Sequence, residues 1–423
     1  MNKITKPLLL LTSIIIFNAC STTYQIAKEL KEQEKSNSYF KGFVLYNPAS
    51  NKTLINHNGA KFFTPASNTK LYTFYTAYRT FKDSVKALEY KKIGDSLLIK
   101  GTADPSLFYS FDSTKVVNFL KKDTAKIYLV DAIIDEPVYG SGWAWDDYAY
   151  YYQAEKSLFP VYGNIVTYGI SDGGGLQTIP NYFTNEIRVL DSVQTDRDLE
   201  KNQFYLSKYN HKKQYVPFKT SNNLVAKLLS EAINKEVTVV KNDNYDNLKP
   251  LYSIPYDSLY KQMLVVSDNF IAEQLMLQVG DEVAGKYSVT DAIDYSLTHY
   301  LNDLPQKPRW VDGSGLSRYN LFTPQDMVHL LTKMYREIPK EKLLSYFPVG
   351  GESGTLKNWY GNDKPFVFAK SGSLSNNYNL SGYIITKKGN LLIFSSMNNH
   401  YKIPTSQLKK NVEDTLLKIY NNY

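Results

Sequence analysis

The sequence predicts an α/β (α+β) protein, in which both ends of the chain form one domain with an antiparallel sheet flanked by helices, interrupted by a large β-rich insertion. Three observations predict this class. Short apolar runs flank turn residues near both ends, apolar residues recur at helical spacing beside them, and the middle alternates strand-like runs with turns. The chain has 423 residues, 43% of them hydrophobic, which is enough for two or three domains.

The first ordered elements are predicted to be a hairpin and a buried helix. Apolar runs at 42–46 and 54–56 flank a segment rich in Asn, Pro and Ser, which favours a turn. A helix is predicted to follow over 67–81, because apolar residues recur three and four positions apart: Leu71, Phe74, Tyr75, Tyr78 and Phe81. Ser67 and Lys70 would then share one face of its first turn.

The middle of the chain changes character. Strands separated by turns are predicted at 97–99, 101–107, 127–134 and 187–190. Helical spacing returns at 222–234 and again at 269–279. These patterns place a β-rich insertion at 91–245, between the two parts of the main domain, 42–90 and 246–423.

The chain is predicted to end in a strand, a hairpin and a helix. The strand at 366–368 precedes Lys370, and hairpin strands at 381–385 and 391–396 flank a Lys-Lys-Gly-Asn turn. The final helix is amphipathic and carries Leu408, Val412, Leu416 and Leu417. We expect the two ends of the chain to close around one antiparallel sheet.

The N-terminus has the pattern of an export signal over residues 1–19. Lys3 and Lys6 precede an apolar stretch that is too short to anchor a helix across a bilayer. The sequence Phe-Asn-Ala then precedes Cys20, the only cysteine, and resembles a bacterial lipobox. We therefore predict an exported, periplasmic lipoprotein that is anchored in the outer membrane through lipidated Cys20. Residues 20–41 would form the tether. The alternative is an incidental cysteine at an ordinary cleavage site.

Charge and tyrosine content give weaker indications. The 49 basic and 41 acidic residues give a net charge of +8, but the charge is spread along the chain and predicts no nucleic-acid partner. The 36 tyrosines reflect either a lineage bias or a groove that binds a polar polymer.

Three short motifs indicate a serine acyl-transfer site. Ser67-Asn68-Thr69-Lys70, Ser267-Asp268-Asn269 and Lys370-Ser371-Gly372 correspond, in this order, to S-x-x-K, S-D-N and K-[ST]-G. Each motif alone has an ordinary explanation, since the first two are typical of helix N-caps and the third of a strand end. Their order and their predicted settings on helix, loop and strand favour the catalytic interpretation.

The motif residues have the chemistry that acyl transfer needs. A serine hydroxyl needs a neighbouring base, and Lys70 can accept the proton of Ser67 only while it is neutral. Burial beside Lys370 would lower the pKa of Lys70, because poor solvation and a nearby positive charge both oppose protonation. Ser267 could relay the proton to the departing amine. Asn269 could bind both Lys70 and a substrate amide.

The third motif would bind the substrate. Lys370, helped by the Ser371 hydroxyl, would attract a carboxylate, and the backbone N–H groups of Ser67 and Ser373 would stabilise the tetrahedral oxyanion. Gly372 lies between these binding residues. This chemistry requires no histidine and no metal.

The chain resembles the low-molecular-mass class C penicillin-binding proteins, the D-alanyl-D-alanine carboxypeptidase/endopeptidase family. Besides the three motifs, the resemblance includes residues 65–71, a G-x-x-D-P-x-L segment at 101–107, and the stretches 142–147 and 312–318. It implies a serine β-lactamase/DD-peptidase-like transpeptidase fold, action on peptidoglycan stem peptides, covalent inhibition by β-lactams, and no metal or organic cofactor. One departure is Ser371, where threonine is more usual, and serine keeps the hydroxyl.

Two other classes of function remain open. A β-lactamase or an esterase would use the same serine but would turn over β-lactams or esters quickly. A catalytically idle cell-wall-binding lipoprotein would keep the fold without the chemistry. Among the other acidic residues, Asp104, Asp146 and Asp147 are interpreted as hydrogen-bonding residues rather than paired catalytic carboxylates. Asp312 either positions an active-site loop or belongs to a plain turn.

Overall fold

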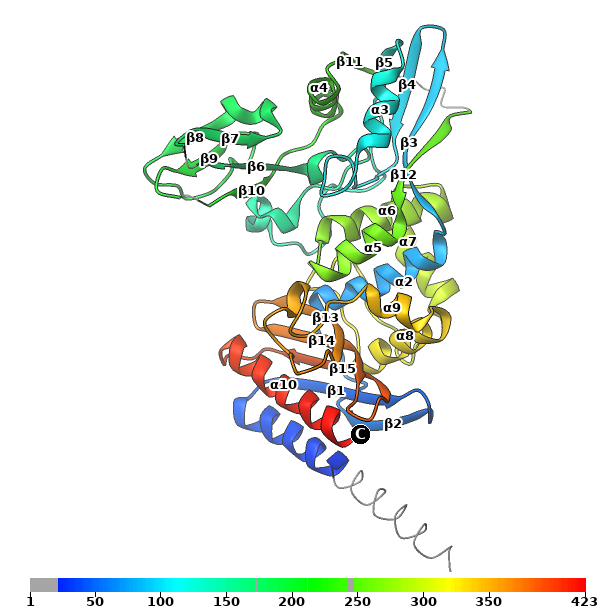
Figure 1. Ribbon diagram of the computed structural model, residues 1–423, viewed down its shortest axis with the longest axis vertical. Coiled ribbons are helices and arrows are strands. Elements are labelled where there is room, and N and C mark those ends of the chain that lie inside the picture. Colours follow the sequence, from blue (N-terminus) through cyan, green and yellow to red (C-terminus); the bar gives the residue numbers. More distant parts are fainter. Residues whose placement is uncertain (1–21, 172, 211, 242–246) are drawn as a thin grey trace, which may run out of the picture.

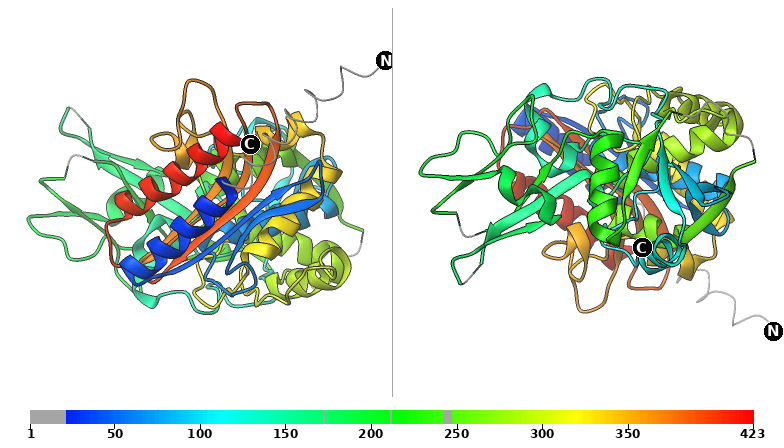
Figure 2. Two further views of the ribbon diagram at one scale, coloured as in Figure 1. Left: turned by 90° about the horizontal axis from the view of Figure 1, so that it is seen from below. Right: turned by 90° about the horizontal axis from the view of Figure 1, so that it is seen from above.

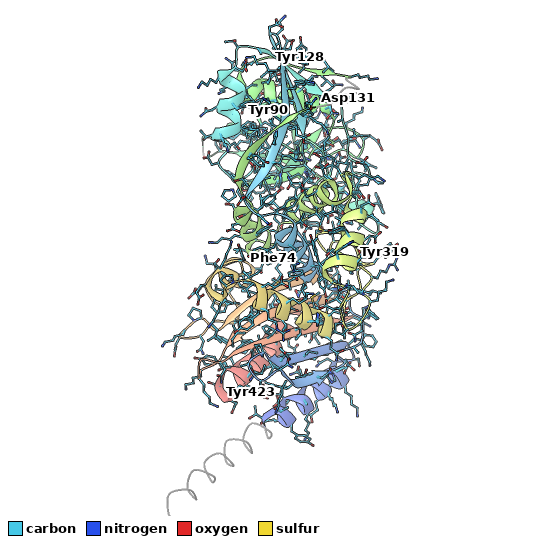
Figure 3. The ribbon with its side chains drawn as sticks, turned by 90° about the vertical axis from the view of Figure 1, so that its right-hand side faces the viewer. Phe74, Tyr90, Tyr128, Asp131, Tyr319 and Tyr423 are labelled. Atoms are coloured by element: carbon cyan, nitrogen blue, oxygen red, sulfur yellow. The ribbon has the colours of Figure 1, made fainter. Side chains whose placement is uncertain are left out.

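The structure is a computed structural model that describes residues 22–171, 173–210, 212–241 and 247–423. The molecule is elongated, with a five-stranded sheet at one end and a second five-stranded sheet at the other (Figure 1). Figure 3 shows Phe74 near the middle of its length, Tyr128 at one end and Tyr423 at the other. The predicted leader and Cys20 lie outside the described residues. No helix among the described residues is both long enough and apolar enough to cross a membrane.

Both ends of the chain form one antiparallel sheet, as predicted. Its strand order is β13-β14-β15-β1-β2. The central pairing joins the two ends, with Phe43 opposite Ser396. The strand bounds are β1 (Phe40–Asn47), β2 (Lys52–His57), β13 (Val367–Leu374), β14 (Asn377–Ile385) and β15 (Leu391–Asn399).

Two helices cover one face of this sheet, and one of them corrects a prediction. Residues 22–37, predicted as part of a tether, form a helix beside α10 (Thr405–Asn422) (Figure 2). Ile26 and Leu30, four apart and buried, pack into one cluster with the α10 residues Leu408, Val412 and Leu416. The polar composition of this segment hid its narrow apolar stripe.

One helix from the second part of the chain packs on the opposite face, and helices from both parts build the largest core cluster with it. Phe74 packs edge-on against Tyr260 at 5.3 Å between ring centroids. The helices are α2 (Lys70–Thr80), α5 (Tyr256–Val265), α6 (Asn269–Ala284), α7 (Val289–Tyr295), α8 (Pro324–Glu337) and α9 (Lys340–Ser345).

The insertion contains a mixed sheet with the strand order β11-β5-β4-β3-β12. The predicted limits, 91 and 245, are corrected, because β3 begins at Ser84 and β12 ends at Pro255 within the same sheet. Antiparallel pairing with β3 holds β12 in this sheet. The elements are β3 (Ser84–Ile93), β4 (Ser96–Gly101), α3 (Thr114–Lys122), β5 (Lys126–Val130), α4 (Asn222–Ile233), β11 (Val237–Val240) and β12 (Lys249–Pro255).

A second lobe of the insertion projects to one side (Figure 1). It contains the three-stranded sheet β10-β6-β7 and a parallel pair, β8 and β9. The strands are β6 (Ile165–Ile170), β7 (Leu176–Ile179), β8 (Ile187–Leu190), β9 (Phe204–Ser207) and β10 (Gln214–Pro217).

The strand predicted over 101–107 is wrong beyond Gly101. The chain continues as a buried loop, in which the Asp104 carboxylate accepts hydrogen bonds from the hydroxyls of Ser106 and Ser253. Asp104 therefore has the hydrogen-bonding role predicted for it.

Candidate active site

Ser67 lies in a tight turn rather than at the start of the predicted α-helix. A 3-10 turn, η1 (Ala66–Thr69), precedes α2 and leaves the Ser67 side chain partly exposed. Strand β13 passes so close that a Cβ atom on Gly372 would lie 2.9 Å from the Ser67 nitrogen. Glycine is thus required in the third motif, and Ser373 follows directly beside the turn.

Lys70 is fully buried and connects Ser67 with two other segments. Its Nζ lies 3.0 Å from Ser67 Oγ, 2.6 Å from Asn269 Oδ1 and 2.7 Å from the Ser314 carbonyl oxygen. An ammonium group has three protons to donate to these three acceptors. When one proton leaves, the free lone pair can accept the hydroxyl proton of Ser67.

Burial lowers the pKa of Lys70 to about 8, against the opposing effect of the Asp312, Asp268 and Glu273 carboxylates. About a tenth of the Lys70 side chains would then be neutral at pH 7. A general base must be unprotonated in a usable fraction of the molecules, and this pKa provides that fraction.

The second motif lies between α5 and α6. Ser267 has a positive φ of 65°, and Asp268 caps α6 by accepting from the backbone nitrogen of Ile271 at 3.0 Å. Asn269 directs its amide oxygen to Lys70 and donates from Nδ2 to the Tyr152 carbonyl at 2.9 Å. Its predicted contact with Lys70 is therefore present, while one of its amide protons is already bound within the protein.

The third motif lies within β13. Lys370 Nζ donates to Ser267 Oγ at 2.8 Å and to the Ser371 carbonyl at 2.6 Å. Burial, and then the charge of Lys70, holds the pKa of Lys370 well below its usual value. The sequence predicted that burial and a neighbouring lysine would together lower the pKa of Lys70. Burial is the largest cause at both lysines, and charge repulsion between them adds to it at Lys370.

Glu273, Thr355 and the Ser314 carbonyl contact the motif residues and were not predicted to do so. The buried Glu273 carboxylate accepts from the backbone nitrogens of Ser314, at 2.7 Å, and Gly313, at 3.1 Å, and so orients the loop whose carbonyl faces Lys70. Burial and the neighbouring Asp312 raise the pKa of Glu273 above its usual value. The signal was its position four residues after Asn269, on the same helical face. Thr355 accepts from the Ser371 hydroxyl at 2.7 Å.

Asp312 positions the active-site loop, which was one of its two predicted roles. Its carboxylate accepts from the Gly315 nitrogen at 2.9 Å, the Asn320 amide at 2.7 Å and the Trp143 indole at 2.9 Å. A Cβ on Gly315 would lie 1.9 Å from the Ala66 carbonyl oxygen, so the loop packs directly on the Ser67 turn. Asp146 and Asp147 lie in the first turn of η2 (Trp145–Ala149).

Comparison with known proteins gives one family and several relatives. The D-Ala-D-Ala carboxypeptidase 3 (S13) family matches residues 22–204 and 208–423. The chain is 23% identical to the D-alanyl-D-alanine carboxypeptidase DacB of Haemophilus influenzae, over 89% of this chain and 91% of that protein. It is 24% identical to the penicillin-sensitive carboxypeptidase A of Dictyostelium discoideum, over 81% and 78%. The crystal structure of penicillin binding protein 4 (dacB) from H. influenzae matches with a TM-score of 0.74 at 22% identity, covering 94% of this chain and 99% of that one.

Proposed function

The chain belongs to the D-Ala-D-Ala carboxypeptidase 3 (S13) family, and from this premise we propose that Ser67 is the nucleophile with which it cleaves D-Ala–D-Ala bonds of peptidoglycan stem peptides. One observation carries the proposal. Lys70 Nζ, buried and with a lowered pKa, lies 3.0 Å from Ser67 Oγ, as a general base for that hydroxyl must.

Acylation begins when neutral Lys70 takes the Ser67 proton. Oγ then bonds to the carbonyl carbon of the penultimate D-Ala, and the oxyanion is held by the backbone N–H groups of Ser67 and Ser373. The C–N bond breaks as the proton held by Lys70 passes to the departing amine through the Ser267 hydroxyl, which is bound to Lys370. Ser267 gives one proton and receives one, and Lys70 becomes neutral. Terminal D-Ala leaves, and the shortened peptide remains as an ester on Ser67.

Hydrolysis returns the enzyme to its starting state. Lys70, neutral again, takes a proton from water, and the resulting hydroxide attacks the ester carbonyl. The same two backbone N–H groups hold the second oxyanion, and Ser67 Oγ leaves with the proton carried by Lys70. A D-Ala cross-link presents the same acyl group on a longer amine, so the same steps give endopeptidase activity.

The purified protein should release D-alanine from a pentapeptide ending in D-Ala–D-Ala and should hold penicillin as a stable adduct. A pentapeptide amide should react more slowly, by about ten- to a hundredfold, because Lys370 and Ser371 lose a charged hydrogen bond to the terminal carboxylate. Mass spectrometry of the adduct and chromatography of the products measure all three.

Other outcomes would identify the alternatives. Rapid penicillin turnover without D-alanine release would identify a β-lactamase, and fast ester hydrolysis alone an esterase. A protein that neither reacts with penicillin nor releases D-alanine would be an idle cell-wall-binding protein. Equal rates for the acid and the amide would remove Lys370 from carboxylate binding.

We also propose that the protein is an exported lipoprotein, lipidated at Cys20, on the periplasmic side of a bacterial membrane. The lipobox-like sequence before the only cysteine supports this proposal. Because the helix over residues 22–37 begins two residues later and packs on α10, the lipid would attach close to the folded domain, opposite the insertion.

Growth with radiolabelled palmitate should label the wild-type protein, and Cys20→Ala should lose the label and membrane association together. Penicillin labelling of the soluble variant is the control, and it should persist because Cys20 lies outside the enzymatic domain. An unlabelled, soluble wild-type protein would exclude lipidation and leave the enzyme proposal intact.

A further inference from the structure

A groove of about 660 Å³ lies between α5 and the side lobe of the insertion. Four tyrosines, a phenylalanine, two isoleucines and a valine line it, together with one serine, one threonine and one glutamine. None of these described lining residues is charged. The groove therefore offers apolar ring faces together with hydroxyl and amide groups that can form hydrogen bonds.

Several apolar side chains that line the groove are exposed to solvent. Tyr151, Ile179, Tyr215 and Val266 all line it, and they are between 49% and 63% exposed. Exposed apolar side chains that gather in one concave site, rather than scatter singly, indicate a binding surface.

Its outer wall is one face of the three-stranded sheet β10-β6-β7. Tyr215 lies directly opposite Thr167, which in turn lies opposite Ile179. Directly opposed residues of antiparallel strands project to the same face, so these three side chains form a continuous row. The row combines the flat aromatic ring of Tyr215 with the hydroxyl of Thr167 and the apolar side chain of Ile179.

Other lining residues of the groove have strained backbone. Phe108, Ser110 and Tyr162 have positive φ angles of 58°, 51° and 56°, and the Phe108 and Tyr162 rings stack at 4.9 Å. Bulky residues rarely adopt this conformation, and such strain gathers at ligand sites. The stacked Phe108 and Tyr162 rings pack against the core of the insertion on one side and line the groove on the other.

The groove lies beside the second motif of the candidate active site. Val266 precedes Ser267 in the chain, and the Tyr109 hydroxyl donates to Asp268 at 2.6 Å. Asp268 in turn caps the helix that begins with Asn269. A substrate larger than the stem peptide bound at Ser67 would therefore have the groove as a neighbouring surface.

We propose that this groove binds the N-acetylated sugar rings of the glycan strand whose stem peptide is being cleaved, an inference that rests on the proposed peptidase function. N-acetylated sugars are neutral, with apolar ring faces for the aromatic side chains, and with hydroxyl and amide groups for the Tyr, Thr and Gln side chains. A stem peptide, by contrast, carries carboxylate and amino groups, which would need charged partners that this lining does not provide.

The test compares a disaccharide-pentapeptide with the same pentapeptide without sugars. The wild-type enzyme should cleave the sugar-bearing substrate with a higher kcat/KM, and Tyr215→Ala should reduce that advantage about five- to tenfold, the contribution of one stacked ring. The rates with sugar-free pentapeptide and penicillin should not change. Tyr209→Ala is the matched control, because Tyr209 is an exposed tyrosine of the same insertion that does not line the groove.

A binding measurement separates this inference from the peptidase proposal. N-acetylglucosamine trimer should bind the Ser67→Ala protein in titration calorimetry, and adding Tyr215→Ala should weaken binding by a similar factor. If the wild-type protein cleaves neither substrate but binds the trimer at Tyr215, the peptidase proposal fails and the groove assignment stands. Three results would overturn the groove assignment: an equal loss of rate on both substrates, equal effects of Tyr209→Ala and Tyr215→Ala, or no binding of the trimer. A loss of rate confined to the free pentapeptide would also overturn it and would show that the groove binds peptide.

Discussion

Replacing Ser67 by alanine is expected to abolish both the covalent penicillin adduct and the release of D-alanine. The substitution removes the only atom that forms the acyl bond in the proposed mechanism, and no other hydroxyl occupies its position 3.0 Å from Lys70 Nζ among the described contacts. Mass spectrometry of the intact protein after exposure to penicillin measures the adduct directly.

The Ser67→Ala protein should remain folded. The Ser67 side chain caps no helix, because the turn η1 begins after Pro65 without a side-chain capping bond. The variant loses one hydrogen bond to Lys70, which is worth about 1 kcal/mol. Thermal unfolding checks this, and Ser375→Ala, an exposed serine in the β13–β14 turn, is the control that should still be labelled. A stable penicillin adduct on Ser67→Ala would show that another residue is the nucleophile.

The main sheet could be predicted from the sequence because each of its strands has a local sequence pattern. The apolar runs near residues 43 and 394 needed only turn residues beside them to be identified, and their pairing follows from burial. The helix over residues 22–37 could not be identified in this way, because its apolar stripe contains only a few residues and gains its stability by packing on α10. The segment after Gly101 has the apolar residues of a strand because it is buried against α6. It forms a loop there, and Gln274 Nε2 of α6 donates to the Ala103 carbonyl at 3.1 Å.

The motif residues were also accessible to sequence reasoning, but their surroundings were not. Spacing alone placed Lys70 one turn from Ser67, and order placed Ser267 and Lys370 in the same site. The Ser314 carbonyl and Glu273 reach the site through a loop and a helix whose packing no local pattern reveals. The carboxylates of Asp312, Asp268 and Glu273 partly offset the effect of burial on the pKa of Lys70, and only the three-dimensional arrangement brings them near it.

Lys70→Arg should reduce acylation by penicillin by a factor on the order of 10² or more, because arginine keeps the charge but cannot become neutral near pH 7. For the wild-type enzyme, protonation of Lys70 removes the base, so kcat/KM should rise about tenfold per pH unit below pH 8 and level off above it, where the lowered pKa of about 8 places the transition. Stopped-flow acylation from pH 6 to pH 10 measures this profile.

Lys100→Arg is the matched control. Lys100 lies on β4 in the insertion, so this variant should be acylated by penicillin at the wild-type rate.

The Lys70→Arg variant separates two roles of the lysine. If Lys70 served only as a fixed positive charge beside Ser67, arginine would largely preserve the rate and the profile would fall, not rise, as the lysine loses its proton above pH 8. If Lys70 is the base, the rate is lost at every pH up to 10 in the variant, because the guanidinium stays protonated throughout that range. Near-normal acylation by Lys70→Arg, or a wild-type rate that stays constant between pH 6 and pH 8, would exclude Lys70 as the base and leave the hydroxyl of Ser67 to be activated by another group.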